Sequence, residues 1–509
     1  MKKILFLLLT GLMLTISPGA KANYPIDGSA DLILGGSTGK FAPFYVNSNN
    51  NGKITQGDNL LIDLNLSDPL NLNKRFDFAW GAEALTGWSN SADYGRWDSE
   101  QNALVYNNSQ HPAYVWLQQL YASVKWRSLF LSAGMKNNPS PLVDATLSSG
   151  DLVWSGNARS IPEVRIGFVD FQNIPFTRGW VQIDAALSYG KFFDSSWQKN
   201  HYSYASGHIN TGTLWTYKRI YLRTNPSQRF HAKFGFQMTG LFGGKTQYYS
   251  DGKLWRTNDN YSGAKDFFDM LLPLNTDKEG YKTGDHKGSF DISFQYRFRD
   301  NSTLRAYTQL FWEDGSGMSK HNGLDGLWGL EYKREGRNWL NGAVVEFLDF
   351  TNQSGPLQWK PSDDPSSVLP GNTTGRDDYY NNYFYRSYTN YGMTIGTPMV
   401  MGDIFNLNGM SWLRYNRVRG IHFALTGTLT DEIEYIVKYS HRKGWGQPFS
   451  QELLTPATSD SWMIGVDWNL RVVPGLKFRA AVAADHGKLP ANTFGVFVNA
   501  QYQTTFFSK

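Results

Sequence analysis

The stretch that decides the fold is Phe290-Asp291-Ile292-Ser293-Phe294-Gln295-Tyr296-Arg297-Phe298, in which bulky apolar residues alternate with polar ones. Side chains of a β-strand point alternately to its two faces, so one face of this segment is apolar and the other is polar. The turn residues Asp300-Asn301-Ser302 follow, and 303–313 alternate in the same way. The pattern recurs at 230–238 and 476–485. It predicts amphipathic strands joined as hairpins.

The lengths of the connections distinguish two architectures that share this alternation. A soluble sandwich of two sheets would show the same period. Outer-membrane barrels, however, have short periplasmic turns and long outer loops in strict succession. The short connections here are 127–128, 224–229, 300–302, 334–338, 430–432 and 471–475, and the long ones are 86–113, 137–159, 193–213, 240–288, 351–419 and 443–459. We therefore predict an all-β antiparallel barrel, in which 169–179 is long for a periplasmic turn.

Counting strands so that short and long connections alternate gives 18. This number is even and puts both chain ends on the periplasmic side, as the class requires. A count of 16 is the alternative. The expected strands are 31–40, 59–66, 75–85, 114–126, 129–136, 160–168, 180–192, 214–223, 230–239, 289–299, 303–313, 327–333, 339–350, 420–429, 433–442, 460–470, 476–486 and 494–507. The aromatic-rich last strand would close the barrel by pairing with the first strand. Only Asn23 to Ala30 of the mature chain would precede that first strand. No domain boundary is visible.

The first residues have the form of a secretory leader. Met1-Lys2-Lys3 precede an apolar run from Ile4 to Ile16, and Ala20-Lys21-Ala22 has the small-x-small form of a cleavage site. A retained anchor is the alternative, but the run is shorter than the ~20 residues that a spanning helix needs. We predict that 1–22 is a signal peptide and that 23–509 is a single barrel domain in the outer membrane.

Composition limits the partners and the chemistry. The chain has no Cys, which excludes a disulfide scaffold and a thiolate site, and aromatic residues make up 15%. The formal charge of +5 includes three lysines of the leader, so nucleic acid is not an expected partner. We expect a monomeric barrel in contact with outer-membrane lipid and lipopolysaccharide, with no cofactor.

Catalytic patterns are missing from the sequence. Ser440 and His441 are neighbours on a strand, so their side chains point to opposite faces and cannot form a dyad. The remaining histidines show no metal-binding spacing such as HExxH. We therefore predict that the protein is not an enzyme and holds no metal.

One stretch resembles a known family. Asn157-Ala158-Arg159-x-Ile161-Pro162-x-Val164-Arg165 is similar to a segment typical of the capsule assembly Wzi family. That resemblance implies an 18-stranded outer-membrane barrel with a lectin-like role in attaching capsular polysaccharide to the cell surface. Enterobacterial members carry additional helical material at the N-terminus, for which this chain has little room before its first strand.

Sugar recognition needs aromatic faces and planar hydrogen-bonding groups, and an anionic sugar adds a need for Arg. Three groups of residues offer this combination. They are Trp154, Asn157, Arg159 and Arg165 at the family motif; Trp215, Tyr217, Arg219, Tyr221 and Arg223 on one strand face; and Tyr379, Tyr380, Tyr383, Tyr385 and Arg386 in a long loop. Each group has a structural alternative. The motif residues would hold a loop down inside the barrel, the strand face would fill the lumen, and the tyrosine cluster would be an ordinary packed loop.

Two functions are expected. The resemblance implies a surface barrel of the Wzi type that binds exported capsular polysaccharide, or another exported glycan, and helps to attach it. The alternative is a porin-like channel for small solutes or oligosaccharides, because barrels of this width are found both open and plugged.

Overall fold

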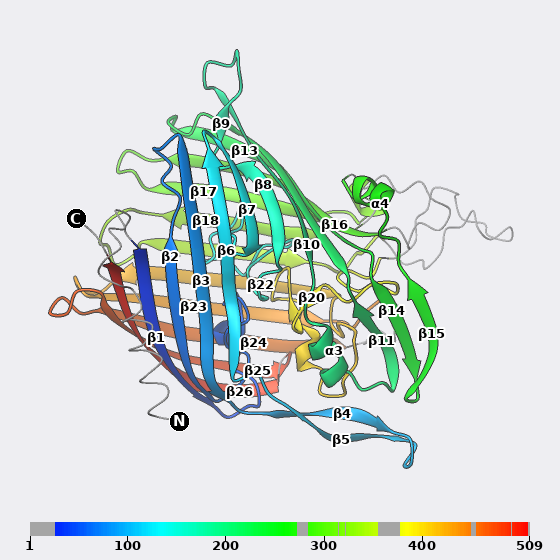
Figure 1. Cartoon of the computed structure of the whole chain (residues 1–509). Coiled ribbons are helices and arrows are strands. Elements are labelled where there is room, and N and C mark those ends of the chain that lie inside the picture. The colour runs from blue at the N-terminus through cyan, green and yellow to red at the C-terminus, as the bar shows by residue number, and fades with distance from the viewer. Residues whose placement is uncertain are drawn as a thin grey trace, which may run out of the picture.

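The computed structural model describes residues 26–271, 284–313, 315–320, 322–354, 377–448, 455–489 and 491–506 (Figure 1). The expected leader and its cleavage site therefore lie outside the described residues. Among the helices of the described part, none is both long enough and apolar enough to cross a membrane.

Eighteen antiparallel strands form a closed barrel. The strands are β1 (Ile26–Ser37), β2 (Asn59–Asp68), β3 (Phe76–Ser89), β6 (Val115–Trp126), β7 (Leu129–Met135), β8 (Glu163–Phe168), β10 (Val181–Lys191), β12 (Leu214–Thr224), β13 (Phe230–Phe242), β16 (Asp285–Arg297), β17 (Thr303–Trp312), β18 (Gly326–Lys333), β19 (Gly342–Asp349), β22 (Val418–Thr428), β23 (Ile433–Gly444), β24 (Ala457–Asn469), β25 (Leu476–Lys488) and β26 (Ala491–Phe506). β1 pairs with β26 from Ile26–Phe506 to Ser37–Gly495, which closes the ring. The prediction of eighteen strands is confirmed.

The first strand is the one whose predicted position was wrong. It runs from Ile26 to Ser37, whereas 31–40 was expected, so it begins before the predicted Asn23 to Ala30 lead-in has ended. The small residues Gly28 and Ala30 occupy lipid-side positions and hide the apolar alternation at this end. A Cβ atom at Gly28 would lie 2.6 Å from the Phe506 ring of the last strand, so a larger residue there would displace that ring. The other strands lie where they were expected, with ends shifted by a few residues.

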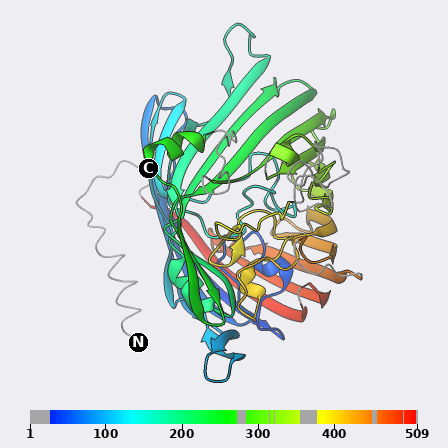
Figure 2. The ribbon, with the colours of Figure 1, turned by 90° about the vertical axis from the view of Figure 1, so that its right-hand side faces the viewer.

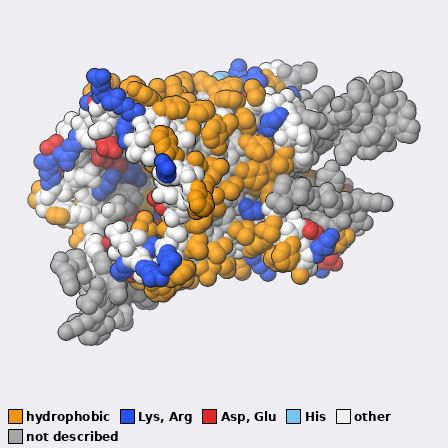
Figure 3. All heavy atoms as spheres, turned by 90° about the horizontal axis from the view of Figure 1, so that it is seen from above, with side chains coloured by type: hydrophobic (Ala, Val, Ile, Leu, Met, Phe, Trp, Pro, Cys, Tyr) orange, Lys and Arg blue, Asp and Glu red, His pale blue; other side chains and the backbone are white. Residues whose placement is uncertain are grey.

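The strand faces differ in polarity as the alternation predicts. On β16 the Phe294 side chain is 43% exposed on the outside of the barrel, whereas Ser293 beside it is 4% exposed and faces the lumen. Figure 3 shows hydrophobic side chains gathered in a broad band across one face of the molecule. Such a band around the outside of a closed barrel is the surface that lipid covers.

The connections alternate between short and long around the barrel. Since outer-membrane barrels keep their short turns in the periplasm, the turns such as 298–302 mark the periplasmic end and the long loops mark the outer end. The long turn at 169–180 includes the two-residue strand β9 (Gln172–Asn173), which extends the sheet along β10 at the periplasmic end (Figure 1).

Several smaller elements lie in the outer loops. They are the hairpin β4 (Ala92–Asp98) and β5 (Ala103–Gln110), the sheet of β11 (Ser206–Thr211), β14 (Lys245–Ser250) and β15 (Lys253–Asp259), the pair β20 (Thr389–Asn390) and β21 (Met393–Thr394), the helices α2 (Phe44–Asn47), α3 (Ser195–His201), α4 (Ala264–Asp269) and α5 (Gly315–Met318), and the 3-10 turn η2 (Asp403–Phe405).

Three loop segments, 38–58, 136–162 and 377–417, fold into the lumen and together form what we call the plug. In Figure 2 the chain around β20 and β21, drawn in yellow, lies within the ring of strands. The plug is joined to the wall by hydrogen bonds, such as Phe44 N–H to Asp485 at 2.8 Å and Leu152 N–H to Gln309 at 3.0 Å. Its apolar side chains share one buried cluster with lumen-facing residues of β12, β17 and β19.

Candidate functional site

The first two predicted groups meet inside the barrel. Trp154 of the plug packs edge-on against Trp215 and Tyr217 of β12, with ring centroids 5.6 and 5.2 Å apart. The Arg165 guanidinium lies 4.8 Å from the Trp154 ring and 4.9 Å from the Tyr217 ring. Glu163 neutralises Arg165 at 2.8 Å. This arrangement fixes segment 136–162 to the wall.

Asn157 joins all three plug segments. Its amide nitrogen donates to the Thr394 carbonyl at 3.0 Å, and its amide oxygen accepts from the Asn49 N–H at 3.0 Å. Arg159 is half-buried, with its guanidinium between the rings of Trp116 and Tyr391. Burial lowers the pKa of Arg159 to about 10, so the side chain remains charged at neutral pH.

The remaining members of the strand group line the lumen below Tyr217. Arg219 forms an ion pair with Asp184 at 3.0 Å. The Tyr221 hydroxyl donates to Asp291, and Arg223 donates to Gln182 at 2.7 Å. These side chains bind residues of neighbouring strands and occupy space on the lumen side of the barrel wall.

The tyrosine group divides into buried and exposed members. Tyr379, Tyr380 and Tyr385 are fully buried in the plug, and the Tyr380 hydroxyl donates to the Leu152 carbonyl. Arg386 makes two hydrogen bonds to the buried carboxylate of Asp194. Tyr383, by contrast, is 44% exposed. Tyr379, Tyr380 and Tyr385 therefore belong to the packed core of the plug, as the structural alternative for this loop expects, and Tyr383 does not.

Tyr383 belongs to a cluster that sequence reasoning missed. Its ring lies 5.0 Å from that of Tyr248 on β14, which in turn lies 5.6 Å from Trp255 on β15. Trp255 is 57% exposed, and the Arg256 guanidinium lies 5.5 Å from the Tyr248 ring. We call these four residues the outer aromatic surface; Tyr383 and Trp255 are its exposed members, whereas Arg256 is half-buried and Tyr248 is buried. The Asp251-Gly252 pair between β14 and β15 is a hairpin signal that would have placed Tyr248, Trp255 and Arg256 on neighbouring strands.

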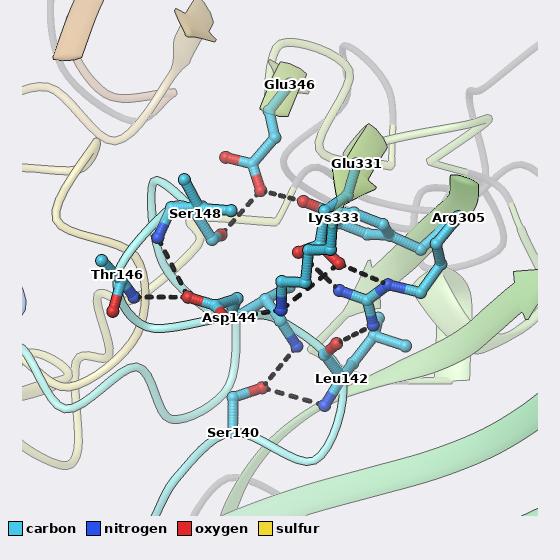
Figure 4. Close-up of polar contacts among 12 residues, drawn as sticks. Ser140, Leu142, Asp144, Thr146, Ser148, Arg305, Glu331, Lys333 and Glu346 are labelled. Atoms are coloured by element: carbon cyan, nitrogen blue, oxygen red, sulfur yellow. Dashed lines mark hydrogen bonds and ion pairs between the residues drawn. The ribbon is translucent and has the colours of Figure 1, made fainter. Parts of the chain in front are cut away.

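At the periplasmic end, the polar contacts drawn in Figure 4 tie the plug to the wall. Several of these residues line a cavity of about 950 Å³ that we call the periplasmic chamber. The Lys333 ammonium contacts Asp144 at 2.6 Å, and Arg305 binds the Glu331 carboxylate through two nitrogens and also donates to the Leu142 carbonyl. Charged residues of both signs thus surround the chamber. Burial alone would raise the pKa of Asp144, but its bonds to Lys333 and to backbone N–H groups lower it.

A titratable group inside the plug gives a pH prediction. Asp403 accepts a hydrogen bond from the Tyr202 hydroxyl at 2.5 Å, and burial raises the pKa of Asp403 to about 7, although Tyr202 and Arg386 oppose the rise. The folded carboxyl thus holds its proton at a pH where the unfolded carboxyl has lost it. The contribution of Asp403 to the stability of the fold is therefore largest at a pH below 3.8, the ordinary pKa of the group, and declines as the pH rises to about 7.

We expect Asp403→Asn to remove this contribution. The apparent Tm of the wild type, read from heat-modifiable gel mobility, should fall relative to that of the variant between about pH 5 and about pH 8, because only the wild type must bury a charge at the higher pH. Comparing the two proteins at each pH cancels the effects of other groups. A Tm difference that stays constant over this range would contradict the prediction.

Across the described residues, His, Asp and Glu side chains form no group of three or more placed to hold a metal ion. The side chains brought together here offer aromatic faces, guanidinium groups and amides, which suit binding of sugars and organic ions.

Of the comparisons with known proteins, the one with solved structures bears on the architecture. No protein-family model matches the chain, and no curated protein matches it. Among solved structures it is similar to Wzi of Escherichia coli, an outer-membrane protein involved in group 1 capsule assembly and a carbohydrate-binding β-barrel, with a TM-score of 0.52 and 10% identity over 93% of this chain and 83% of that chain. OpdK and OpdG of Pseudomonas aeruginosa align with TM-scores of 0.44 and 0.45, each at 9% identity over 95% of this chain and 98% of theirs. At such identities the shared property is the fold, and the chain has the fold of an outer-membrane β-barrel.

Proposed function

We propose that this protein binds an exported polysaccharide at its outer mouth and helps to attach that polymer to the cell surface. The observation that carries the proposal is that three loop segments occupy much of the lumen, and that exposed Tyr383 of the plug lies at the outer end with exposed Trp255 and half-buried Arg256 of β15. A pore for solutes needs an open lumen, whereas a surface lectin needs a rigid outer platform. The similarity to the Wzi structure, a carbohydrate-binding barrel, supports the same choice.

The buried members of the predicted groups have a different role in this proposal. Trp154, Asn157, Arg165 and Arg386 hold the loops in place, and the polymer contacts the outer aromatic surface. Tyr and Trp present large, rigid faces to the apolar sides of sugar rings, and Arg256 supplies a fork of donors for a carboxylate of an anionic glycan. We also propose that residues 1–22 are removed during export.

The test is the ratio of cell-bound to shed polysaccharide in the native strain. We expect the Trp255→Ala and Arg256→Gln variants to lower the affinity for polymer, since losing one charged hydrogen bond costs about 1.5–3 kcal/mol, or roughly tenfold or more. Heat-modifiable gel mobility of each variant verifies that the barrel is folded.

The matched control is Tyr106→Ala on β5, because Tyr106 is as exposed as Trp255, at 57%, and lies on a separate hairpin. Retention should be unchanged in this variant. Equal losses at Tyr106 and Trp255, or unchanged retention in the Trp255 and Arg256 variants, would remove the outer aromatic surface from the binding role.

A porin-like channel is the second candidate, and the periplasmic chamber favours it, because about 950 Å³ of the lumen is open and lined by charged residues. Recording in planar bilayers separates the two functions. A large, steady conductance of the wild type together with normal polymer retention in a deletion strain would favour the channel.

A further inference from the structure

A second cavity in the lumen, of about 560 Å³, has a lining that is unusual for the interior of a barrel. Lumens of outer-membrane barrels are polar. Here Ile436 of β23, Met463 of β24 and Phe497 of β26 all point inward and line the cavity, facing Ile54 of the plug. We call this cavity the side groove. Its volume falls within the range of about 300–1,000 Å³ typical of small-molecule sites.

The strand register explains why the lining is concave. Ile436 pairs with Gly465, Gly465 with Ala481, and Ala481 with Phe497, so the four residues lie in one row across β23 to β26. Two small residues therefore stand between two large ones. The gap between Ile436 and Phe497 is an apolar trough in the wall.

The two ends of the trough differ in charge. On the periplasmic side, Arg479 binds the Asp467 carboxylate through two nitrogens, at 2.6 and 2.9 Å. Lys477 contacts the same carboxylate at 2.7 Å and Glu434 lines this end of the cavity, so cations and carboxylates balance there. On the outer side stands Lys438, paired across the strands with Met463. Within the part of the chain that the structure describes, Lys438 makes no hydrogen bond or ion pair, and its Nζ lies 5.9 Å from the ring of Tyr45.

The carboxylates that attract Lys438 are bonded to other groups. Glu346 accepts hydrogen bonds from the Ser148 hydroxyl and the Ser149 N–H, each at 2.6 Å, and Asp144 is paired with Lys333. Lys438 is therefore a half-buried cation that contacts no carboxylate directly, so its N–H donors are available to an anion that enters beside the apolar trough.

We propose that the side groove binds an amphipathic organic anion, with its anionic head at Lys438 and its apolar body along the trough. The ligand enters from the periplasm, because the side groove and the periplasmic chamber share the lining residues Thr146, Asn341 and Thr426. This site is separate from the outer aromatic surface, so it stands whether or not the protein binds polysaccharide.

The probe is 4-phenylbutyrate, titrated calorimetrically into the full-length mature barrel held in amphipol, and its uncharged amide is the matched ligand. We expect saturable binding of the carboxylate and at least tenfold weaker binding of the amide. Lys438→Gln should weaken binding of the carboxylate by a similar factor and leave binding of the amide unchanged, because Gln removes the charge and keeps most of the length.

Ala481→Phe should abolish binding of both ligands by filling the trough. If the Ala481→Phe protein fails the heat-modifiability check, Met463→Gln is tested in its place. Lys488→Gln, at the exposed outer end of β25, is the matched control and should bind as the wild type does. Absence of saturable binding, equal affinity for carboxylate and amide, or equal losses at Lys438 and Lys488 would overturn the proposal.

Discussion

Replacing Arg386 with alanine is expected to free the outer part of the plug while the barrel itself stays assembled. Arg386 is 2% exposed, and its guanidinium binds Asp194, which is fully buried at the start of α3. Removing one partner of a buried pair leaves the other charge without compensation, at a cost of roughly 3–5 kcal/mol. Hydrogen exchange in 377–417 should therefore accelerate on the order of a hundredfold or more.

Two further variants separate loss of the ion pair from loss of a large side chain. Arg414→Ala removes an exposed arginine from the same segment and should leave the exchange unchanged. Arg386→Met combined with Asp194→Asn removes both charges, and the Asn oxygen can still accept from the Tyr391 N–H that now binds Asp194 at 2.9 Å. The double variant should be less destabilised than Arg386→Ala alone. If it is more destabilised, uncompensated charge is not the cause.

The barrel was predictable from the sequence because its signal is local. A strand of a membrane barrel must be apolar on one side and polar on the other, so segments such as 290–298 carry their assignment within nine residues or so. The prediction for the first strand was wrong because Gly28 and Ala30 do not show that alternation. Their place in the barrel is set by pairing with the last strand, which lies almost the whole length of the chain away in sequence.

The plug was not predictable, because its contacts join residues that are distant in sequence. Asn157 binds Thr394 across 237 positions, and Tyr380 binds Leu152 across 228. The sequence identified aromatic and arginine residues suited to sugar binding, but it left open whether these residues bind sugar or hold a loop in place. The tertiary contacts place most of them in the packed interior, and they bring Tyr383 alone of the tyrosine group to the surface, beside Tyr248 and Trp255.

The assignment of the two faces of β16 gives the second prediction of large effect. Phe294 faces lipid beside Phe230 and Phe234, with ring centroids 6.1 and 6.0 Å away. Phe294→Arg should impair assembly, because a cation on the lipid face costs about 2–4 kcal/mol at the middle of the membrane, falling toward the interfaces, and the ring contacts are lost as well. The fraction of heat-modifiable protein in the membrane measures the loss.

Gln295→Arg is the matched control, since it introduces the same charge one residue further along the strand. Gln295 lines the periplasmic chamber, where a cavity of about 950 Å³ leaves room for the longer side chain in a polar lumen. This variant should assemble as the wild type does. Because successive side chains of a strand point to opposite faces, equal impairment of the two variants, or the reverse order, would mean that the register of β16 is shifted by one residue.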